Sequence, residues 1–139
     1  MIPSSTVEAS FKDSDTSKVT SMGNMFYNCS GLTSLDVSNF DTSNVTYMEG
    51  MFNASSGLTS LDLSNFNTSN VISMRKMFNG CSGLTSLDLS GWDMSSVTST
   101  IGMFNGCSKL GSIRMASCNQ TTIDKITAEK PSGAHISTV

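Results

Sequence analysis

The sequence contains little charge. Only 14% of its 139 residues are Asp, Glu, Lys or Arg, and the net charge is −3. No basic field is therefore present to hold nucleic acid or an anionic membrane surface. The apolar runs are short, and none approaches the roughly 20 residues that span a bilayer. We therefore predict no nucleic-acid partner and no membrane insertion of this chain, whose length suffices for one domain with a hydrophobic core.

The usual marks of export and catalysis are missing too. The opening residues, MIPSSTVEAS, contain neither a basic nor an apolar segment, so the sequence predicts no signal peptide in this chain. The one histidine, His135, lies in the tail with no Ser or acid motif arranged around it. Gly-x-Ser-x-Gly, phosphate-binding glycines and Cys-x-x-Cys are absent. We therefore expect no enzyme, no catalytic residue, no metal and no cofactor.

What the sequence does contain is a repeat of 26 residues. The line CSGLTSLDVSNFDTSNV from residue 29 returns as SSGLTSLDLSNFNTSNV from residue 55 and as CSGLTSLDLSGWDMSSV from residue 81. A period of this length is typical of a solenoid, in which each unit stacks on the next. Residues that occupy one position in successive units, 26 residues apart, are called a column.

The apolar residues form columns that no insertion interrupts. One unit cannot bury its own apolar side chains, so stacking at the strand spacing of about 4.8 Å has to build the core. Eight of the ten methionines fall in such columns, and the methionines are expected to be core residues rather than ligands. The main columns are Val19, Val45, Val71 and Val97; Met25, Met51, Met77 and Met103; Phe26, Phe52, Phe78 and Phe104; Leu32, Leu58, Leu84 and Leu110; Leu35, Leu61, Leu87 and Ile113.

Two periods alternate within each unit. The segment LTSLDLS places Leu87 and Leu89 two positions apart with polar residues between them, which predicts a strand with one buried face. In SNVTYMEGMF the apolar residues are three, three and one positions apart, which predicts a short amphipathic helix. Asp41 and its neighbours would cap that helix, and glycines would end it. Each unit is therefore expected to be strand, turn, short helix, turn.

The predicted fold class is an α/β solenoid, a right-handed leucine-rich-repeat array of about five strand–short-helix units with a parallel sheet on one face. We expect a single domain over 1–139, with a degenerate first unit at 1–13, four repeats over 14–117 and a capping repeat over 118–139. Six strands and five helices are expected. Adding 26 to Leu110 and Ile113 places Ile136 and Val139 in their columns.

The motifs MFNGCSGLTSLDLSGWDMSSVTS and SNFDTSNVTYMEGMF resemble the 26-residue repeat of BspA-type leucine-rich-repeat surface proteins, over residues 14–117. Members of that family are secreted or lipid-anchored bacterial surface proteins, some similar to adhesins, and related arrays occur in protists and viruses. The resemblance implies adhesion at an extracellular, cell-surface or virion-surface location. It implies no particular ligand residues, and this chain differs from full-length members in lacking a signal or an anchor.

The polar positions of the predicted strands form the candidate binding surface. Three carboxylates share a column that ends at Arg114, where the guanidinium could pair with Asp88. A solenoid commonly binds through its sheet, so this column and the serines beside it, called the strip, are a candidate site for a ligand. The strip suits a bridging cation less well, because a cation site needs more oxygen ligands than a flat row provides. The alternative is a solvated Ser/Asp face with a structural role only. The candidate residues are Ser34, Asp36, Ser38, Ser60, Asp62, Ser64, Ser86, Asp88, Ser90 and Arg114.

The four cysteines allow two interpretations. Cys29, Cys81 and Cys107 share one column, and Cys118 continues the column of Phe40, Phe66 and Trp92. Neighbouring units could bring Cys81 and Cys107 within disulfide range, but stacked parallel side chains rarely meet the dihedral requirement. Since Ser55 occupies the same column, buried thiols are favoured.

Two functions follow from these observations. The first is a binding or adhesion module that presents its Ser/Asp-rich sheet to a protein or glycan on another cell surface or matrix. The second is structural: a spacer, fibre, filament, or phage tail or virion subunit that assembles end to end through its terminal strands, because open strand edges favour pairing.

Overall fold

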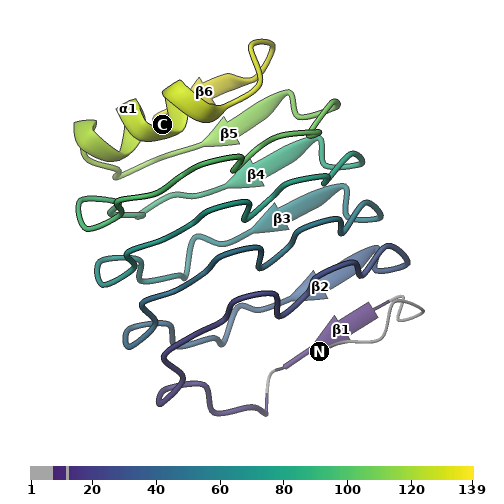
Figure 1. Cartoon of the computed structure of the whole chain (residues 1–139), viewed down its shortest axis with the longest axis vertical. Coiled ribbons are helices and arrows are strands. Elements are labelled where there is room, and N and C mark those ends of the chain that lie inside the picture. Colours follow the sequence, from purple (N-terminus) through teal and green to yellow (C-terminus); the bar gives the residue numbers. More distant parts are fainter. Residues whose placement is uncertain (1–7, 12) are drawn as a thin grey trace.

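The computed structural model describes residues 8–11 and 13–139. The chain winds into a β-solenoid of about five turns with a parallel sheet along one side (Figure 1). We call each turn of the solenoid a coil. Coils stack along the long axis of the molecule, with strand β1 (Glu8–Ser10) near one end and helix α1 (Gln120–Glu129) with strand β6 (His135–Ser137) at the other. The solenoid prediction is confirmed, whereas the leucine-rich-repeat type of α/β coil is not.

Every coil contributes one short strand to the sheet. The strands are β1 (Glu8–Ser10), β2 (Ser34–Asp36), β3 (Ser60–Asp62), β4 (Ser86–Asp88), β5 (Ser112–Arg114) and β6 (His135–Ser137). Their pairing is parallel, and the predicted columns lie side by side: Leu61 opposite Leu87, Leu87 opposite Ile113. The alternation in Ser-Leu-Asp turns the leucines inward and leaves Ser and Asp on the outer face.

The sheet is divided between its second and third strands. β1 pairs with β2, and β3 to β6 form a separate four-stranded sheet. Leu63 and Leu89 donate their N–H groups to the next coil, at Asp88 and Arg114, but the described residues show no equivalent bond from Val37. The two coils still touch at the neighbouring corner, where a side chain at Gly57 would lie 2.7 Å from the Leu32 carbonyl oxygen. We call this break between β2 and β3 the seam.

The four helices expected in the repeats are not formed. That prediction is wrong because the backbone N–H groups of these segments bond between coils: Met48 donates to Ser73 and Phe52 donates to Met77. Within a coil the bonds span three residues, as from Met51 to Met48, and produce consecutive turns. Apolar residues three positions apart therefore belong to the turns of a β-coil here. The neighbouring coil supplies the carbonyl acceptors that a helix would supply from its own backbone.

The fifth predicted helix is present as α1 (Gln120–Glu129). Asn119 caps it, accepting a hydrogen bond from the Thr122 N–H at 2.8 Å. The last coil has no further coil to accept its N–H groups, so bonds within a helix take their place. Ile126 packs into the end of the core, which makes α1 a cap. No helix in the described ranges is long and apolar enough to cross a membrane.

Strand β6 is present, but its register differs from the prediction. Ile136 lies opposite Ile113 rather than in the Leu110 column, and Ser137 lies opposite Arg114. The last coil is therefore three residues shorter than the repeat, since α1 replaces the extended path of the other coils. Val139 lies beyond the paired residues and is exposed. The first predicted strand, VEASF, is present as β1, although its Val7 lies outside the described residues.

The core consists of the predicted apolar columns. Phe26, Phe52, Phe78 and Phe104 stack face to face with ring centroids 5.4–5.7 Å apart. Phe11 closes the N-terminal end of this aromatic column with an edge-on contact to Phe26. Repetition therefore places identical side chains in contact, and their burial stabilises each coil only through its neighbours.

Candidate functional site

A shallow hollow of about 430 Å³ lies on the outer face of the four-stranded sheet. Polar positions of β3 to β6 line it, together with Leu61, Leu87 and Ile113 between them. β3 and β4 each contribute a Ser and an Asp, and β5 contributes a Ser and Arg114, so polar side chains recur at the strand spacing of about 4.8 Å. The lining residues are Ser60, Leu61, Asp62, Ser86, Leu87, Asp88, Ser112, Ile113, Arg114 and Ser137.

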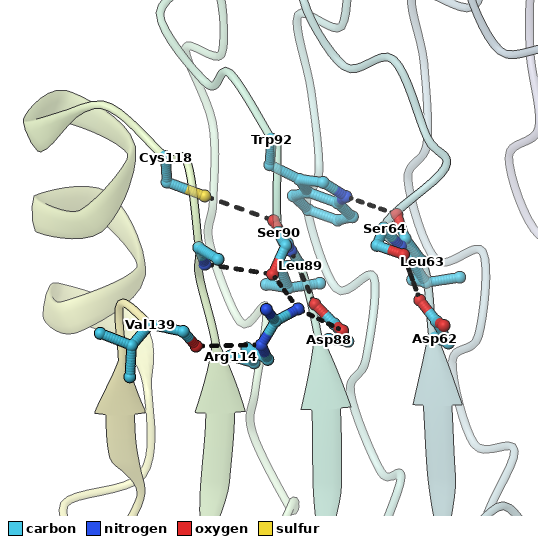
Figure 2. Close-up of polar contacts among 11 residues, drawn as sticks. Asp62, Leu63, Ser64, Asp88, Leu89, Ser90, Trp92, Arg114, Cys118 and Val139 are labelled. Carbon is cyan, nitrogen blue, oxygen red and sulfur yellow. Dashed lines mark hydrogen bonds and ion pairs between the residues drawn. The ribbon is translucent and has the colours of Figure 1, made fainter.

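Each Asp of the sheet first has a local structural role. The Oδ1 atom of Asp62 accepts the Ser64 N–H at 2.9 Å and the Ser64 hydroxyl at 2.6 Å (Figure 2). Oδ1 of Asp88 accepts the Ser90 N–H at 2.9 Å in the same way. These Asx turns end the strand and redirect the chain. One carboxylate oxygen is thus used by the fold, and the second is available to other partners.

Arg114 completes the column as predicted. Its Nη1 atom lies 3.3 Å from Asp88 Oδ2 and 3.2 Å from the Ser90 hydroxyl, and its Nε donates to the Val139 carbonyl at 3.1 Å (Figure 2). The side chain of Arg114 remains 52% exposed. The pair is therefore a positioned surface interaction of modest strength, and the guanidinium keeps an open side toward the hollow.

The carboxylates differ in their electrostatic environment. Partial burial raises the pKa of Asp88, but the hydrogen bonds from Ser90 and Arg114 together outweigh burial and leave that pKa below its ordinary value. Hydrogen bonds from Ser38 lower the pKa of the exposed Asp36. In the described part of the chain no cation pairs with Asp36 or Asp62. The strip therefore has a neutralised end at Arg114 and an acidic end toward the seam.

The structure brings together only part of the predicted strip. Ser34 and Asp36 line a separate hollow beside β1. Asp36 and Ser38 also line a smaller hollow at the seam together with Asp62 and Ser64, and neither hollow includes Asp88. Ser38, Ser64 and Ser90 follow the strands and take part in the turns. Ser137 joins the hollow of the four-stranded sheet although sequence reasoning missed it. Its pairing with Arg114 was hidden by the shortened last coil, so a fixed period of 26 could not locate it.

The cysteine column contributes to the core rather than to the hollow. The thiols of Cys81 and Cys107 donate to the carbonyls of Phe52 and Phe78 at 3.1 and 3.0 Å, and neither residue is in a disulfide. Ser55 makes the same contact to Phe26 at 2.5 Å. Burial raises the pKa of Cys81 to about 12 and that of Cys107 to about 11, so both are poor nucleophiles.

Among the described residues, no group of three or more His, Cys, Asp or Glu is placed to hold a metal ion. His135, the one histidine, lies exposed on the edge strand β6 opposite Ser112. What the arrangement offers chemically is a row of hydrogen-bonding groups that are fixed in place by backbone pairing. Such a surface suits recognition of a polar, extended partner.

Fold and surface define a parallel β-solenoid protein with a repeated polar sheet face. The chain belongs to the family described as "Mycoplasma protein of unknown function, DUF285", whose model matches residues 3–116. Neither the curated proteins nor the solved structures include a match to this chain. The matched segment contains β1 to β5 and ends before α1.

Proposed function

We propose that the chain is a non-catalytic binding module, related to BspA-type leucine-rich-repeat surface proteins, that presents its sheet to a protein or glycan partner. In this proposal the chain is located on the outside of a cell or a virion, and its partner lies on another cell surface or matrix. The single observation that carries the proposal is the hollow of about 430 Å³ along β3 to β6. Solenoids typically bind through such extended surfaces.

The chemistry of the hollow favours a partner rich in hydrogen-bonding groups. Asp62 has a free carboxylate oxygen, Arg114 has an exposed guanidinium, and serines lie between them. Carboxylates and guanidinium form the strong, charge-assisted hydrogen bonds that select a ligand's hydroxyl, amide or charged groups. Because the serine side chains are short and the hollow extends over four strands, a chain-like ligand fits across successive strands.

The test is a glycan and matrix-protein array, followed by affinity measurements on each ligand that binds. Asp62→Asn and Asp88→Asn keep the Asx turn, as Asn67 does with Ser69 elsewhere in the chain, but remove the charge. We expect these variants and Arg114→Gln to weaken binding by about tenfold or more, the loss of one charge-assisted hydrogen bond.

Asp41→Asn is the matched control. Asp41 makes the same Asx turn with Ser43 but lies outside the lining of the hollow. A ligand whose affinity is unchanged by Asp62→Asn, Asp88→Asn and Arg114→Gln would contradict binding at this face. So would a ligand whose affinity falls equally with Asp41→Asn.

The second candidate function is structural: a repeat subunit or spacer of a fibre, filament or virion. The observation that favours it is distinct from the hollow and lies at the two ends of the solenoid. Apolar residues there remain partly accessible, in contrast to the closed core between them.

A further inference from the structure

The two ends of the solenoid have incomplete burial. Side chains of the columns are almost completely buried in the interior coils, and Phe52, Phe78, Met51 and Met77 have no exposed area. The partly buried apolar residues that pack against this core lie almost entirely in the first and last coils, with Leu35 beside the seam as the exception. In the first coil they are Ala9, Phe11, Val19 and Met25; in the last they are Cys118, Ile123 and Ile136.

Charge is distributed unevenly along the solenoid axis. Residues 1–62 contain seven acidic and two basic residues, a net charge of −5, and residues 63–139 contain four acidic and six basic residues, a net charge of +2. Since coils follow one another in sequence order along the axis, the molecule is acidic toward β1 and basic toward β6 (Figure 1). Such a distribution favours head-to-tail approach of two copies and disfavours head-to-head approach.

The terminal strands also have matching outer edges, and among the residues that the structure describes no strand pairs with either edge. In β6, His135 donates its N–H to Gly111 and Ser137 accepts from Met115, so both face β5. Backbone groups alternate in direction along a strand, so those of Ile136 face the open edge. In β1, the register with β2 repeats that of β3 with β4, which directs the backbone groups of Glu8 and Ser10 away from β2.

From these three features we propose that this chain associates with a second copy of itself end to end, with β1 of one copy pairing in parallel with β6 of the next. Continuing the existing register places Glu8 beside His135, Ala9 on Ile136 and Ser10 beside Ser137. The inward column of the strands continues across the contact from Ile136 to Ala9, and a carboxylate meets an imidazole on the outer face. Ala9 and Ile136, one partly buried apolar residue from each end, then cover each other. Because the contact is head-to-tail, it builds an open filament rather than a closed dimer.

The experiment is sedimentation equilibrium of the whole chain over a wide concentration range, in low and in high salt. We expect the average mass to rise without reaching a plateau at two chains, and to rise less in high salt because the end charges are screened. His135→Glu places two carboxylates side by side and should weaken association about tenfold or more. Adding Glu8→Lys to that variant restores an opposite pair and should recover most of the loss.

Ser82→Glu is the matched control. Ser82 is exposed in the middle of the array, so this substitution introduces the same carboxylate away from both ends. It should leave association unchanged. A single-chain mass at every concentration, a plateau at two chains, or equal effects of His135→Glu and Ser82→Glu would overturn the proposal. Circular dichroism of each variant separates lost association from lost folding. The inference does not rest on the proposed ligand binding: Asp62→Asn should leave the mass unchanged.

Discussion

The hydroxyl of Thr68 bonds to both backbone groups of Asp93 in the next coil: it donates to the carbonyl at 2.9 Å and accepts the N–H at 2.8 Å. Thr42 does the same to Asn67, and Thr16 does the same to Asp41. Thr68 is only 1% exposed. This buried threonine ladder joins successive coils outside the strands, including the two coils that the seam separates.

Replacing Thr68 with Val should destabilise the fold, although the substitution hardly changes the side-chain volume. Valine removes the hydroxyl and leaves the N–H and carbonyl of Asp93 without this partner, at a cost of about 1–3 kcal/mol for each buried group that stays unpaired. We expect the free energy of unfolding to fall by about 2 kcal/mol or more in urea denaturation. Thr68→Ser retains the hydroxyl and should lose clearly less; equal losses would contradict the role of the ladder.

Acid should weaken the protein through its Asx turns. Hydrogen bonds from Ser17, Ser43 and Ser95 hold the pKa values of Asp15, Asp41 and Asp93 below their ordinary range. A carboxyl whose folded pKa is depressed contributes stability above its unfolded pKa of about 3.9, and this contribution is lost as the pH falls through the folded value. The free energy of unfolding should therefore drop below about pH 4.

The corresponding variant replaces Asp15, Asp41 and Asp93 with Asn. Asn67 already makes these contacts, with its Oδ1 atom 2.6 Å from the Ser69 hydroxyl, so the turns should survive. Thermal unfolding followed between pH 7 and pH 2 should show a smaller loss of stability for this variant than for the parent. An unchanged pH profile would mean that other carboxyls govern the acid response.

The seam should be the first place in the sheet to open. Leu63 and Leu89 donate their N–H groups to the next coil, whereas within the described ranges Val37 has no such bond to Asp62. Hydrogen exchange should therefore be faster at the Val37 amide than at the amides of Leu63 and Leu89, which hold the same position in their coils. Equal protection of these three amides would show that the sheet is continuous in solution.

Cys81 and Cys107 should resist thiol reagents in the folded protein. Their pKa values of about 12 and about 11 leave almost no thiolate near neutral pH, and both side chains are buried. We expect them to react with an aromatic disulfide only at the rate of unfolding, and more slowly than the partly exposed Cys118. Cys81→Ser should change the free energy of unfolding by less than about 1 kcal/mol, because Ser55 shows that a hydroxyl makes the same bond. Fast reaction at Cys81 would contradict its burial.

Sequence reasoning succeeded where repetition alone determines the structure. Leu61, Leu87 and Ile113 lie in one column, as expected from their spacing, and Arg114 meets Asp88. The terminal strands at 8–10 and 135–137 could be found because positions 26 residues from the neighbouring strands fall within or beside them, although this period misplaced the register of the second. The period shows which residues, 26 positions apart in the sequence, lie side by side in the structure. A non-repetitive sequence does not contain this information.

Sequence reasoning failed where the choice of hydrogen-bond partner decides the conformation. Met48 and Phe52 have a spacing compatible with a helix, and no local feature shows that their N–H groups bond to Ser73 and Met77. The seam was equally hidden, since the segments on its two sides, SLD at β2 and SLD at β3, are identical. Asp36 therefore could not be separated in advance from the hollow that contains Asp62 and Asp88.

The direction of the lateral bonds has a consequence for how such arrays change length. In the repeats the backbone N–H groups of the turn segment donate to carbonyls of the next coil, from Met22 to Tyr47 and from Met48 to Ser73. In α1 the corresponding N–H groups bond to carbonyls within the helix itself. Each interior coil thus requires a successor, while α1 requires only a predecessor. Evolution or design can duplicate or delete whole 26-residue units anywhere before α1, but a chain cut within the array would leave a row of amides facing water.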